Sequence, residues 1–338
     1  MHRPRPTLES VALHAGVSRA TVSRVVNGST RVAEDSRAAV LRAIEELGYV
    51  PNQAARSLVT QRTDSFALVL PEEPGRVFSD DEFFQGVVRG VGQELEEADK
   101  QLVLMMARSP AGRDRVERFA LARHVDGVMV ASMHGADPLP AALARMGIPV
   151  VCNERLLGAA ALPYVLPYVG VDNAGGAALA VRQLLRSGRT RVATVAGPQD
   201  MVAGIDRLTG YRTALKEAGR EPVVAAGDFT QESGAVAMRE LLAREPELDA
   251  VFVASDLMGL GVLRALRQAG RRVPEDVAVV GFDDVQAARY ADPPLTTVRQ
   301  PIAEIGRRLA RQLLRLAGGE AIEPAVVLDV ELVLRGSA

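Results

Sequence analysis

The sequence predicts an α/β protein in which an all-α N-terminal head precedes a body of two similar lobes built on parallel sheets. Up to residue 50 the apolar residues recur at helical spacing. From residue 64 onward, short apolar runs alternate with amphipathic helical stretches, which is the pattern of parallel strands covered on both faces. These runs are too many for one small sheet, and the pattern nearly repeats about residues 163–172. We therefore expect two lobes with a ligand cleft between the carboxyl ends of their strands.

Composition and charge are those of a globular protein with a basic head. The 338 residues are 48% hydrophobic and 24% charged, and no run approaches the roughly 20 apolar residues that span a membrane. No apolar run follows the charged N-terminus, so we expect no secretory signal, no membrane partner and a cytoplasmic protein. A single cysteine, Cys152, excludes an internal disulfide framework. Residues 1–62 hold nine arginines against five acidic residues, whereas the remainder is net negative. This asymmetry suggests that only the head meets a polyanion.

Residues 7–27, TLESVALHAGVSRATVSRVVN, predict two short helices joined by a tight turn. Thr7 is a suitable N-cap, Gly16 can end the first helix in the left-handed conformation, and Ser18 can cap the second helix. The outer face of the second helix carries residues that could bond phosphates and base edges but could not form a core: Arg19, Ala20, Thr21, Ser23, Arg24 and Asn27. This is the layout of a helix-turn-helix whose second helix enters a DNA major groove. An ordinary helical hairpin with a polar face is the alternative for this segment alone.

A third helix over residues 35–47, ended by Gly48, is expected to close a small three-helix core. Its N-cap position holds Ala33, so its start relies on acidic residues near the helix dipole. Residues 52–59 follow Pro51 and are good helix formers, but an isolated helix of about eight residues is marginal in water. We expect this segment to fold only when it docks, which makes it a candidate hinge. A solvated tether is the alternative.

In the body, the apolar runs predict strands at 66–70, 101–106, 127–131, 149–152, 168–171, 191–197, 250–254 and 277–282. The helical stretches between them include 85–98, 174–186, 208–218, 233–243 and 257–269.

An enzyme is one alternative, because doubly wound sheets often bind nucleotides. However, the nearest glycine pattern, GLGVLR, has Arg264 in place of the third glycine and lies inside a predicted helix. The four histidines are scattered and no GxSxG motif occurs. We expect no catalytic residue, no metal and no cofactor. A solute-binding protein for a transporter is the other alternative, but such a protein needs export, and the basic head argues against it.

Four segments together resemble the lactose-repressor/galactose-repressor family of bacterial transcription regulators. They are TLESVALHAGVSRATVSRVVNG, AIEELGYVPNQAARSL, YVGVDNAGGAALAVRQLL and GFDDVQAARYADPPLTTVRQP, and they extend over nearly the whole chain. The resemblance implies a helix-turn-helix domain at 1–50, a hinge at 51–63 and a periplasmic-binding-protein-like body at 64–338 for effector binding and dimerisation. Within the body, we expect lobe 1 to hold about 64–165 and 298–323, and lobe 2 to hold about 166–297 and 324–338.

The resemblance also implies how the head would contact DNA. The positions that read base edges in the family are Arg19, Ala20 and Arg24. The positions that would hold phosphates are Thr21, Ser23 and Asn27. The hinge and minor-groove positions are Asn52, Ala55 and Leu58, with Leu58 as the leucine that the family inserts at the operator centre. Two symmetric insertions imply a homodimer on palindromic operator DNA.

The implied effector site lies in the cleft, and its expected residues are Arg207, Asp283, Ser255, Phe83, Ser132 and Gln300. Paired, Arg207 and Asp283 suit a neutral polyhydroxy ligand, because the carboxylate accepts from hydroxyls and the guanidinium donates. Ser255 stands where the family often has asparagine, and Glu154 replaces a usual aspartate, which leaves the effector's identity open. Core packing is the alternative role for Phe83.

These features lead to the hypothesis of a dimeric, DNA-binding repressor of carbohydrate-related genes. Ligand in the cleft would change the angle between the lobes, respace the hinges and disfavour insertion of Leu58. A sugar inducer is the favoured effector. A corepressor-dependent regulator that senses a non-sugar metabolite is the alternative.

Overall fold

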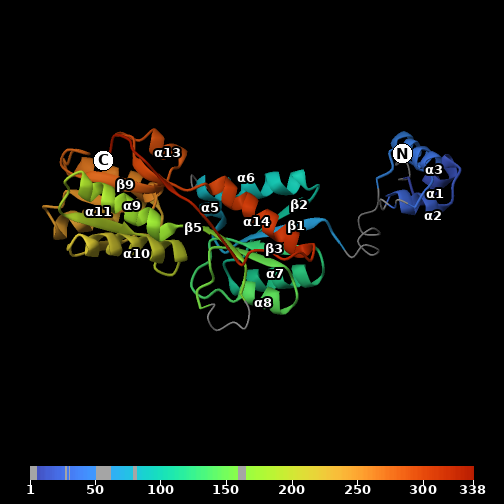
Figure 1. Cartoon of the computed structure of the whole chain (residues 1–338), viewed down its shortest axis with the longest axis horizontal. Helices are drawn as coiled ribbons and strands as arrows, with labels where there is room; N and C mark the ends of the chain where they lie inside the picture. The colour runs from blue at the N-terminus through green and yellow to red at the C-terminus, as the bar shows by residue number, and fades with distance from the viewer. Residues whose placement is uncertain (1–5, 27–28, 30, 51–61, 79–81, 159–164) are drawn as a thin grey trace. The chain divides into compact units, whose positions relative to one another are not determined.

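The computed structural model describes residues 6–26, 29, 31–50, 62–78, 82–158 and 165–338, and the chain divides into two compact units at residues 63 and 64 (Figure 1). Within these described residues, no helix is long and apolar enough to cross a membrane.

The described part of the first unit consists of helices α1 (Leu8–Ala15), α2 (Arg19–Val26) and α3 (Glu34–Leu47). Their buried core is formed by Val11, Ala12, Val22, Val25, Val40, Ala43 and Tyr49. The apolar faces predicted for the three helices therefore pack against one another. As predicted, α3 ends at Gly48 and starts at Ala33 without a side-chain cap.

Caps define both ends of α1 and the start of α2. Thr7 Oγ1 accepts a hydrogen bond from the Ser10 backbone N–H at 3.3 Å, and α1 ends at Gly16, whose φ is 68°. Ser18 Oγ accepts from the Thr21 backbone N–H at 3.1 Å at the start of α2. These contacts satisfy N–H groups that a helix leaves unpaired at its start, and they confirm the predicted caps.

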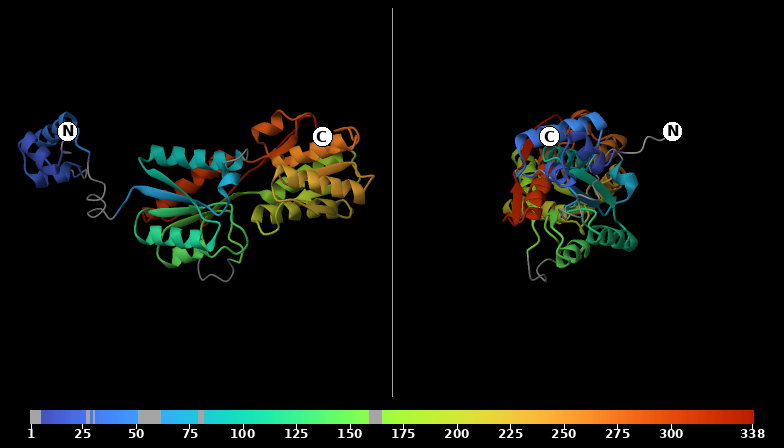
Figure 2. Two further views of the ribbon diagram at one scale, coloured as in Figure 1. Left: turned by 180° about the vertical axis from the view of Figure 1, so that it is seen from behind. Right: turned by 90° about the vertical axis from the view of Figure 1, so that its right-hand side faces the viewer.

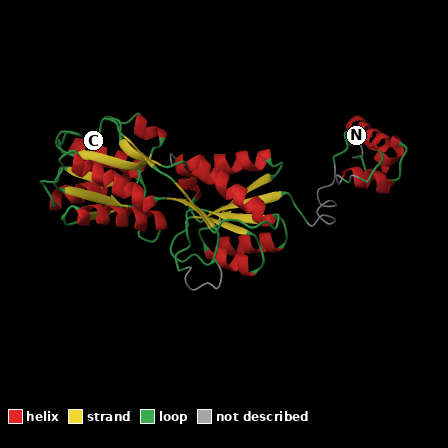
Figure 3. Ribbon diagram, in the orientation of Figure 1, coloured by secondary structure: helices red, strands yellow, loops and turns green. Residues whose placement is uncertain are grey.

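Lobe 1 of the second unit is built on a parallel sheet with strand order β11-β5-β4-β3-β1-β2 among the described residues. Its strands are β1 (Ser65–Leu70), β2 (Gln101–Met106), β3 (Gly127–Val130), β4 (Val150–Asn153), β5 (Tyr168–Val171) and β11 (Ala325–Leu328). Helices α6 (Glu82–Glu97) and α14 (Ile302–Ala317) cover one face, and α7 (Pro110–Leu121) and α8 (Leu139–Arg145) cover the other (Figure 3). The short α5 (Pro74–Val77) follows β1.

Lobe 2 repeats this architecture with strand order β12-β10-β9-β8-β6-β7, again within the described residues. Its strands are β6 (Val192–Ala196), β7 (Val223–Ala226), β8 (Ala250–Val253), β9 (Ala278–Asp283), β10 (Thr296–Arg299) and β12 (Glu331–Val333). Helices α9 (Asn173–Arg186) and α10 (Val202–Glu217) cover one face, and α11 (Gln231–Arg244) and α12 (Asp256–Gln268) cover the other (Figure 2). The short α13 (Gln286–Arg289) follows β9, and the edge pair β10–β12 is antiparallel.

The chain passes between the lobes after β5, after β10 and between β11 and β12. The sequence prediction placed the first and last of these passages near residues 165 and 323, which is too early. It is wrong there because β5 and β11 pair with each other in lobe 1, with Tyr168 opposite Ala325. β10 belongs to lobe 2, so the middle passage follows residue 299 and not residue 297.

Helices α6 and α14 pack closely because glycines line their contact. A Cβ atom on Gly90 would overlap the Ala303 carbonyl oxygen, and one on Gly306 would overlap the Val87 carbonyl oxygen. Gly92 lies on the same helix as Gly90, but a Cβ there would meet no atom within 4 Å. Substitutions at Gly90 and Gly92 therefore distinguish the effect of close helix packing from that of helix propensity.

We expect Gly90→Ala to lower the free energy of unfolding by about 1–3 kcal/mol, because the overlap forces two helix backbones apart. Gly92→Ala is the matched control and should raise it by roughly 0.5–1 kcal/mol, since alanine favours the helix over glycine. Urea denaturation of the full chain measures both. Equal effects at the two positions would contradict the packing argument.

Candidate functional site

A cavity lies between the two lobes of the second unit, where strands of both sheets end. Ser132 and Glu154 line it from segments that follow β3 and β4, and Ser255 and Asp283 line it from the ends of β8 and β9. The empty space is about 880 Å³, part of it open to solvent. The carboxyl edge of parallel strands is where such sheets place ligands.

Arg207 of α10 is buried in the wall of this cavity, and its guanidinium donates hydrogen bonds to the groups around it. Its Nη1 donates to Asp283 Oδ1 at 3.2 Å and to the Ala254 carbonyl oxygen at 2.7 Å, and its Nε donates to Asn173 Oδ1 at 2.8 Å. The guanidinium lies 3.7 Å from the centre of the Phe282 ring. Burial lowers the pKa of Arg207, but arginine starts so high that it stays charged. A buried cation of this kind is stable only because it is paired and hydrogen-bonded.

Asp283, at the end of β9, joins Arg207 to the segment that returns to lobe 1. Its Oδ1 also accepts a hydrogen bond from Gln300 Nε2 at 2.6 Å. Burial raises the pKa of Asp283, and the charge of Arg207 acts against that rise. The structure thus brings together the predicted pair and Gln300 in one polar wall. This wall can both donate to and accept from ligand hydroxyls.

Two residues absent from the predicted site complete this wall. Asn173, the first residue of α9, accepts from Arg207 with Oδ1 and donates to Glu154 Oε1 at 3.0 Å with Nδ2. Burial raises the pKa of Glu154 to about 7, against the charge of Arg207 and the hydrogen bond from Asn173. A Cβ on Gly170 would come within 2.5 Å of Glu154 Oε2, so this glycine makes room for the carboxylate. Asn173 lies at a strand-to-helix turn, and this position is the sequence feature that could have identified it as a site residue.

Ser132, Ser255 and Phe83 also line the cavity, but each has a structural contact as well. Ser132 Oγ donates to Glu72 Oε1 at 2.6 Å. Ser255 Oγ accepts from the backbone in the first turn of α12 at 3.3 Å and serves as its N-cap. The Phe83 ring packs edge-on against Phe84, with ring centres 5.6 Å apart. These side chains therefore shape the cavity in addition to facing it.

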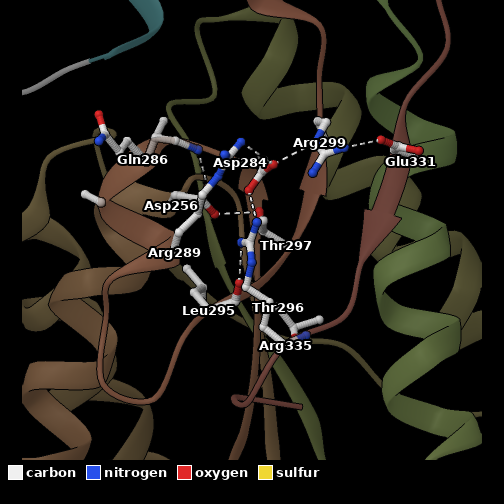
Figure 4. Close-up of polar contacts among 12 residues, drawn as sticks. Asp256, Asp284, Gln286, Arg289, Leu295, Thr296, Thr297, Arg299, Glu331 and Arg335 are labelled. Carbon is white, nitrogen blue, oxygen red and sulfur yellow. Dashed lines mark hydrogen bonds and ion pairs between the residues drawn. The ribbon is translucent and has the colours of Figure 1, made fainter.

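Asp284, the residue after Asp283, is the buried centre of an ion-pair cluster whose arginines reach toward the surface (Figure 4). Its carboxylate is 1% exposed; Oδ2 lies 2.6 Å from Arg299 Nε and 3.2 Å from Arg289 Nη2, and Oδ1 pairs with Arg335. Asp283 and Asp284 both have positive φ, 121° and 61°, a conformation that costs non-glycine residues free energy. The cluster therefore holds the turn that points the Asp283 carboxylate into the cavity wall.

Asp256 fixes the same turn from α12. Its Oδ2 accepts from the Val285 backbone N–H at 3.0 Å, and its Oδ1 accepts from Thr297 Oγ1 at 2.6 Å (Figure 4). Burial, together with the charge of Asp283, raises the pKa of Asp256 well above its usual range. The backbone directly after the aspartate pair is thus anchored to α12, and α12 is tied to β10.

On the first unit, the predicted base-reading residues Arg19, Ala20 and Arg24 are exposed on α2, and Thr21 and Ser23 are partly exposed. Arg19 Nε lies 2.9 Å from Glu9 Oε1 of α1, and both side chains are more than half exposed. The predicted residues Asn27, Asn52, Ala55 and Leu58 lie outside the described residues.

A helix-turn-helix unit joined to a two-lobed body with a polar cleft defines a DNA-binding regulator that carries a ligand-binding module. The family model for bacterial regulatory proteins of the lacI family matches residues 7–52, and that for the periplasmic binding protein-like domain matches residues 181–338. The HTH-type transcriptional regulator CelR of Thermobifida fusca is 52% identical over 339 residues, which cover 99% of each chain.

Solved structures agree with this match. A transcriptional regulator CelR–cellobiose complex is 50% identical, with 99% of this chain and 100% of that chain covered and a TM-score of 0.78. The lac repressor dimer bound to operator and the anti-inducer ONPF is 28% identical, with 98% and 99% covered and a TM-score of 0.85. The chain belongs to the lacI family of bacterial regulatory proteins, and the predicted resemblance is confirmed. It is a DNA-binding transcriptional regulator, and these relatives are regulators rather than enzymes.

We expect Asp284→Ala to destabilise the chain more than Asp284→Gly, by about 1 kcal/mol, because only glycine adopts the left-handed backbone without cost. Both variants lose the same ion pairs, so their difference isolates the backbone conformation. Thermal unfolding of the two variants measures it. If the alanine variant proved the more stable, the turn would not be strained.

Proposed function

We propose that this regulator is a homodimeric repressor of carbohydrate-related genes, and that its effector is a neutral glucose disaccharide of the cellobiose type. The observation that carries the proposal is the buried wall of Arg207, Asp283 and Gln300 facing a small-molecule cavity. The CelR structure that is 50% identical over nearly the whole chain is a complex with cellobiose, which supports the choice of ligand.

The chemistry of the cavity fits a sugar. Carboxylate and amide oxygens accept hydrogen bonds from hydroxyls, while the Arg207 guanidinium and the Gln300 amide donate to ring and hydroxyl oxygens. Phe83 and Phe229 line the same cavity and offer apolar surface to the C–H faces of a sugar ring. A neutral ligand also leaves the pairing of Arg207 with Asp283 intact, so neither buried charge loses its partner.

In the proposed response, binding of the ligand changes the affinity of the protein for operator DNA. A sugar that contacts residues of both lobes favours one angle between them over others. It can change operator affinity only by its differential affinity for the states that bind DNA well and poorly. We infer that the sugar acts as an inducer, and that the protein works in the cytoplasm at the nucleoid, where operator DNA lies.

For the first unit, the proposal assigns base reading to Arg19, Ala20 and Arg24. It assigns phosphate contacts to Thr21, Ser23 and Asn27. It assigns the hinge to Asn52, Ala55 and Leu58, with Leu58 in the minor groove of a palindromic operator. The exposure of Arg24 on α2 supports the assignment, since an arginine can bond guanine bidentately.

Arg24→Ala should weaken specific operator binding by about 10- to 100-fold, the value of one bidentate base contact, while nonspecific binding falls much less. Arg42→Ala, on the exposed side of α3, is the control and should affect both kinds of binding equally. Titrations of operator and scrambled DNA at one salt concentration measure this. Equal losses for Arg24→Ala would remove its base-reading role.

Arg207→Ala should weaken cellobiose binding by roughly 10- to 100-fold, since it removes charged hydrogen bonds at the ligand, while operator affinity without sugar is kept. Arg212→Ala, an exposed arginine on the same helix, should bind cellobiose normally. Calorimetry and operator-release assays measure both variants, with thermal unfolding as a check on folding.

Two results would overturn different parts of the proposal. A normal sugar response in Arg207→Ala would remove the cleft assignment. A wild-type chain that responds to another sugar but not to cellobiose would remove only the proposed ligand.

A further inference from the structure

We propose that His134 is a proton-dependent clasp between the lobes, in which the doubly protonated ring ties Glu72 of lobe 1 to Asp200 of lobe 2 across the rim of the cleft. Glu72, His134 and Asp200 together form the His134 clasp. This device governs closure of the body itself, and it does not depend on the identity of the effector.

The geometry of the ring requires both nitrogens to carry a proton. His134 follows β3, and its Nδ1 lies 2.9 Å from Asp200 Oδ2 while its Nε2 lies 3.2 Å from Glu72 Oε1. Ionised carboxylates only accept hydrogen bonds, and a neutral imidazole has a single N–H to donate. A neutral ring would therefore direct a nitrogen lone pair at one carboxylate. Only the imidazolium satisfies both contacts.

The surroundings keep Glu72 ionised. Its carboxylate is 5% exposed, lies 3.2 Å from Arg76 Nη1 of α5, and accepts from Ser132 Oγ at 2.6 Å. Burial acts to raise the pKa of Glu72, but the hydrogen bonds from His134 and Ser132 and the charge of Arg76 outweigh it and lower the pKa. Across the cleft, burial acts to raise the pKa of Asp228 of lobe 2, but hydrogen bonds to its carboxylate and, to a smaller extent, the charge of Arg76 lower it. The charged groups around the ring are thus Glu72 and Asp200, with Arg76 and Asp228 beyond them.

The ring is held between lobes at the edge of the cavity. Asp200 lies in the loop between β6 and α10, and its backbone oxygen accepts from the Gly135 N–H at 2.6 Å. Gly135 and Ser132 line the cavity. Opening of the cleft at this rim would separate the ring from Asp200. The protonation state of His134 is therefore coupled to the lobe angle.

The direction of the pH dependence follows from the two carboxylates that contact His134. The hydrogen bond to Glu72 is the largest influence that raises the pKa of His134, Asp200 acts in the same direction, and burial opposes them. Because Glu72 and His134 both belong to lobe 1, closure adds only the Asp200 contact, and the stabilisation of the closed form is fully present below the pKa that His134 has in the open form. It is lost as the pH rises through the raised pKa.

Another ionisable contact crosses the same cleft and titrates in the same range. Glu154 of lobe 1 accepts from Asn173 of lobe 2, and its pKa of about 7 means that it gains charge as the pH rises. Because burial outweighs the attraction of that charge to Arg207 and raises the pKa, the closed cleft favours the protonated carboxyl, so Glu154 acts in the same direction as the His134 clasp. The test must therefore compare variants that share Glu154.

The interlobe ion pair of Arg155 with Asp206 supplies a matched control. It joins the segment after β4 to α10, as the clasp joins the segment after β3 to the loop before α10. Arginine and a paired aspartate keep their charges throughout the neutral range. This pair therefore still contributes to closure at high pH, although the charge of Asp206 also raises the pKa of Glu154.

The experiment measures lobe closure by energy transfer in the full chain without effector. Dyes are placed at Arg118→Cys on α7 and Lys216→Cys on α10, both exposed positions. Cys152 is buried and burial raises the pKa of its thiol to about 12, so it stays unlabelled. Transfer is recorded from about pH 5.5 to about pH 9, which spans the ordinary pKa of histidine.

We expect His134→Gln to reduce transfer relative to the wild type at low pH, with the difference disappearing toward high pH. Asp206→Asn should reduce transfer at every pH, including the high-pH end at which the difference for His134→Gln has disappeared. Asp200→Asn changes a side chain that is 57% exposed and is a second test that leaves the fold intact. Its difference from the wild type should also shrink as the pH rises. A difference for His134→Gln or Asp200→Asn that does not change with pH, or no difference at all, would overturn the proposal.

Discussion

The buried charge of Arg207 is the constraint on which the cleft depends. A guanidinium that is 4% exposed must find acceptors inside the protein, and each of its partners is in turn held by another residue. Asn173 connects it to Glu154 of lobe 1, and Asp283 connects it to Gln300 at a passage between lobes. Such a network acts as a unit, since loss of any member leaves a buried group unpaired. The wall that would meet a ligand is thus rigid before the ligand arrives.

This arrangement requires an unfavourable backbone conformation at Asp283 and Asp284. Contacts within lobe 2 stabilise that conformation. Asp283 can face Arg207 only because it and Asp284 take positive φ values. Asp284 with its arginines and Asp256 with its backbone contact anchor that turn from α13, β10, α12 and the C-terminal segment. Stability and ligand recognition are therefore linked through adjacent residues.

Features that depend on local pattern could be predicted from the sequence, and features that depend on long-range pairing could not. The caps at Thr7 and Ser18 follow from residue type at a helix start, and the family motifs pointed to the pair of Arg207 and Asp283. By contrast, no local signal says which sheet an apolar run joins, so β5 and β11 were assigned to the wrong lobe. The strand β10 begins with two threonines and was not recognised as buried. The His134 clasp escaped notice because its partners lie 62 and 66 residues away.

The contact between Arg19 and Glu9 bears on how the regulator responds to ionic strength. Each cation that neutralises a DNA phosphate releases counterions, which makes affinity fall as salt rises. Arg19 lies beside the Glu9 carboxylate of the neighbouring helix, so binding in its proposed role would replace that carboxylate partner with acceptors on DNA. In its proposed role at the DNA, the contact of Arg19 is therefore less sensitive to salt than that of an arginine with no acidic neighbour. Glu9 on α1 can thus make the contribution of Arg19 depend less on general electrostatic attraction to DNA.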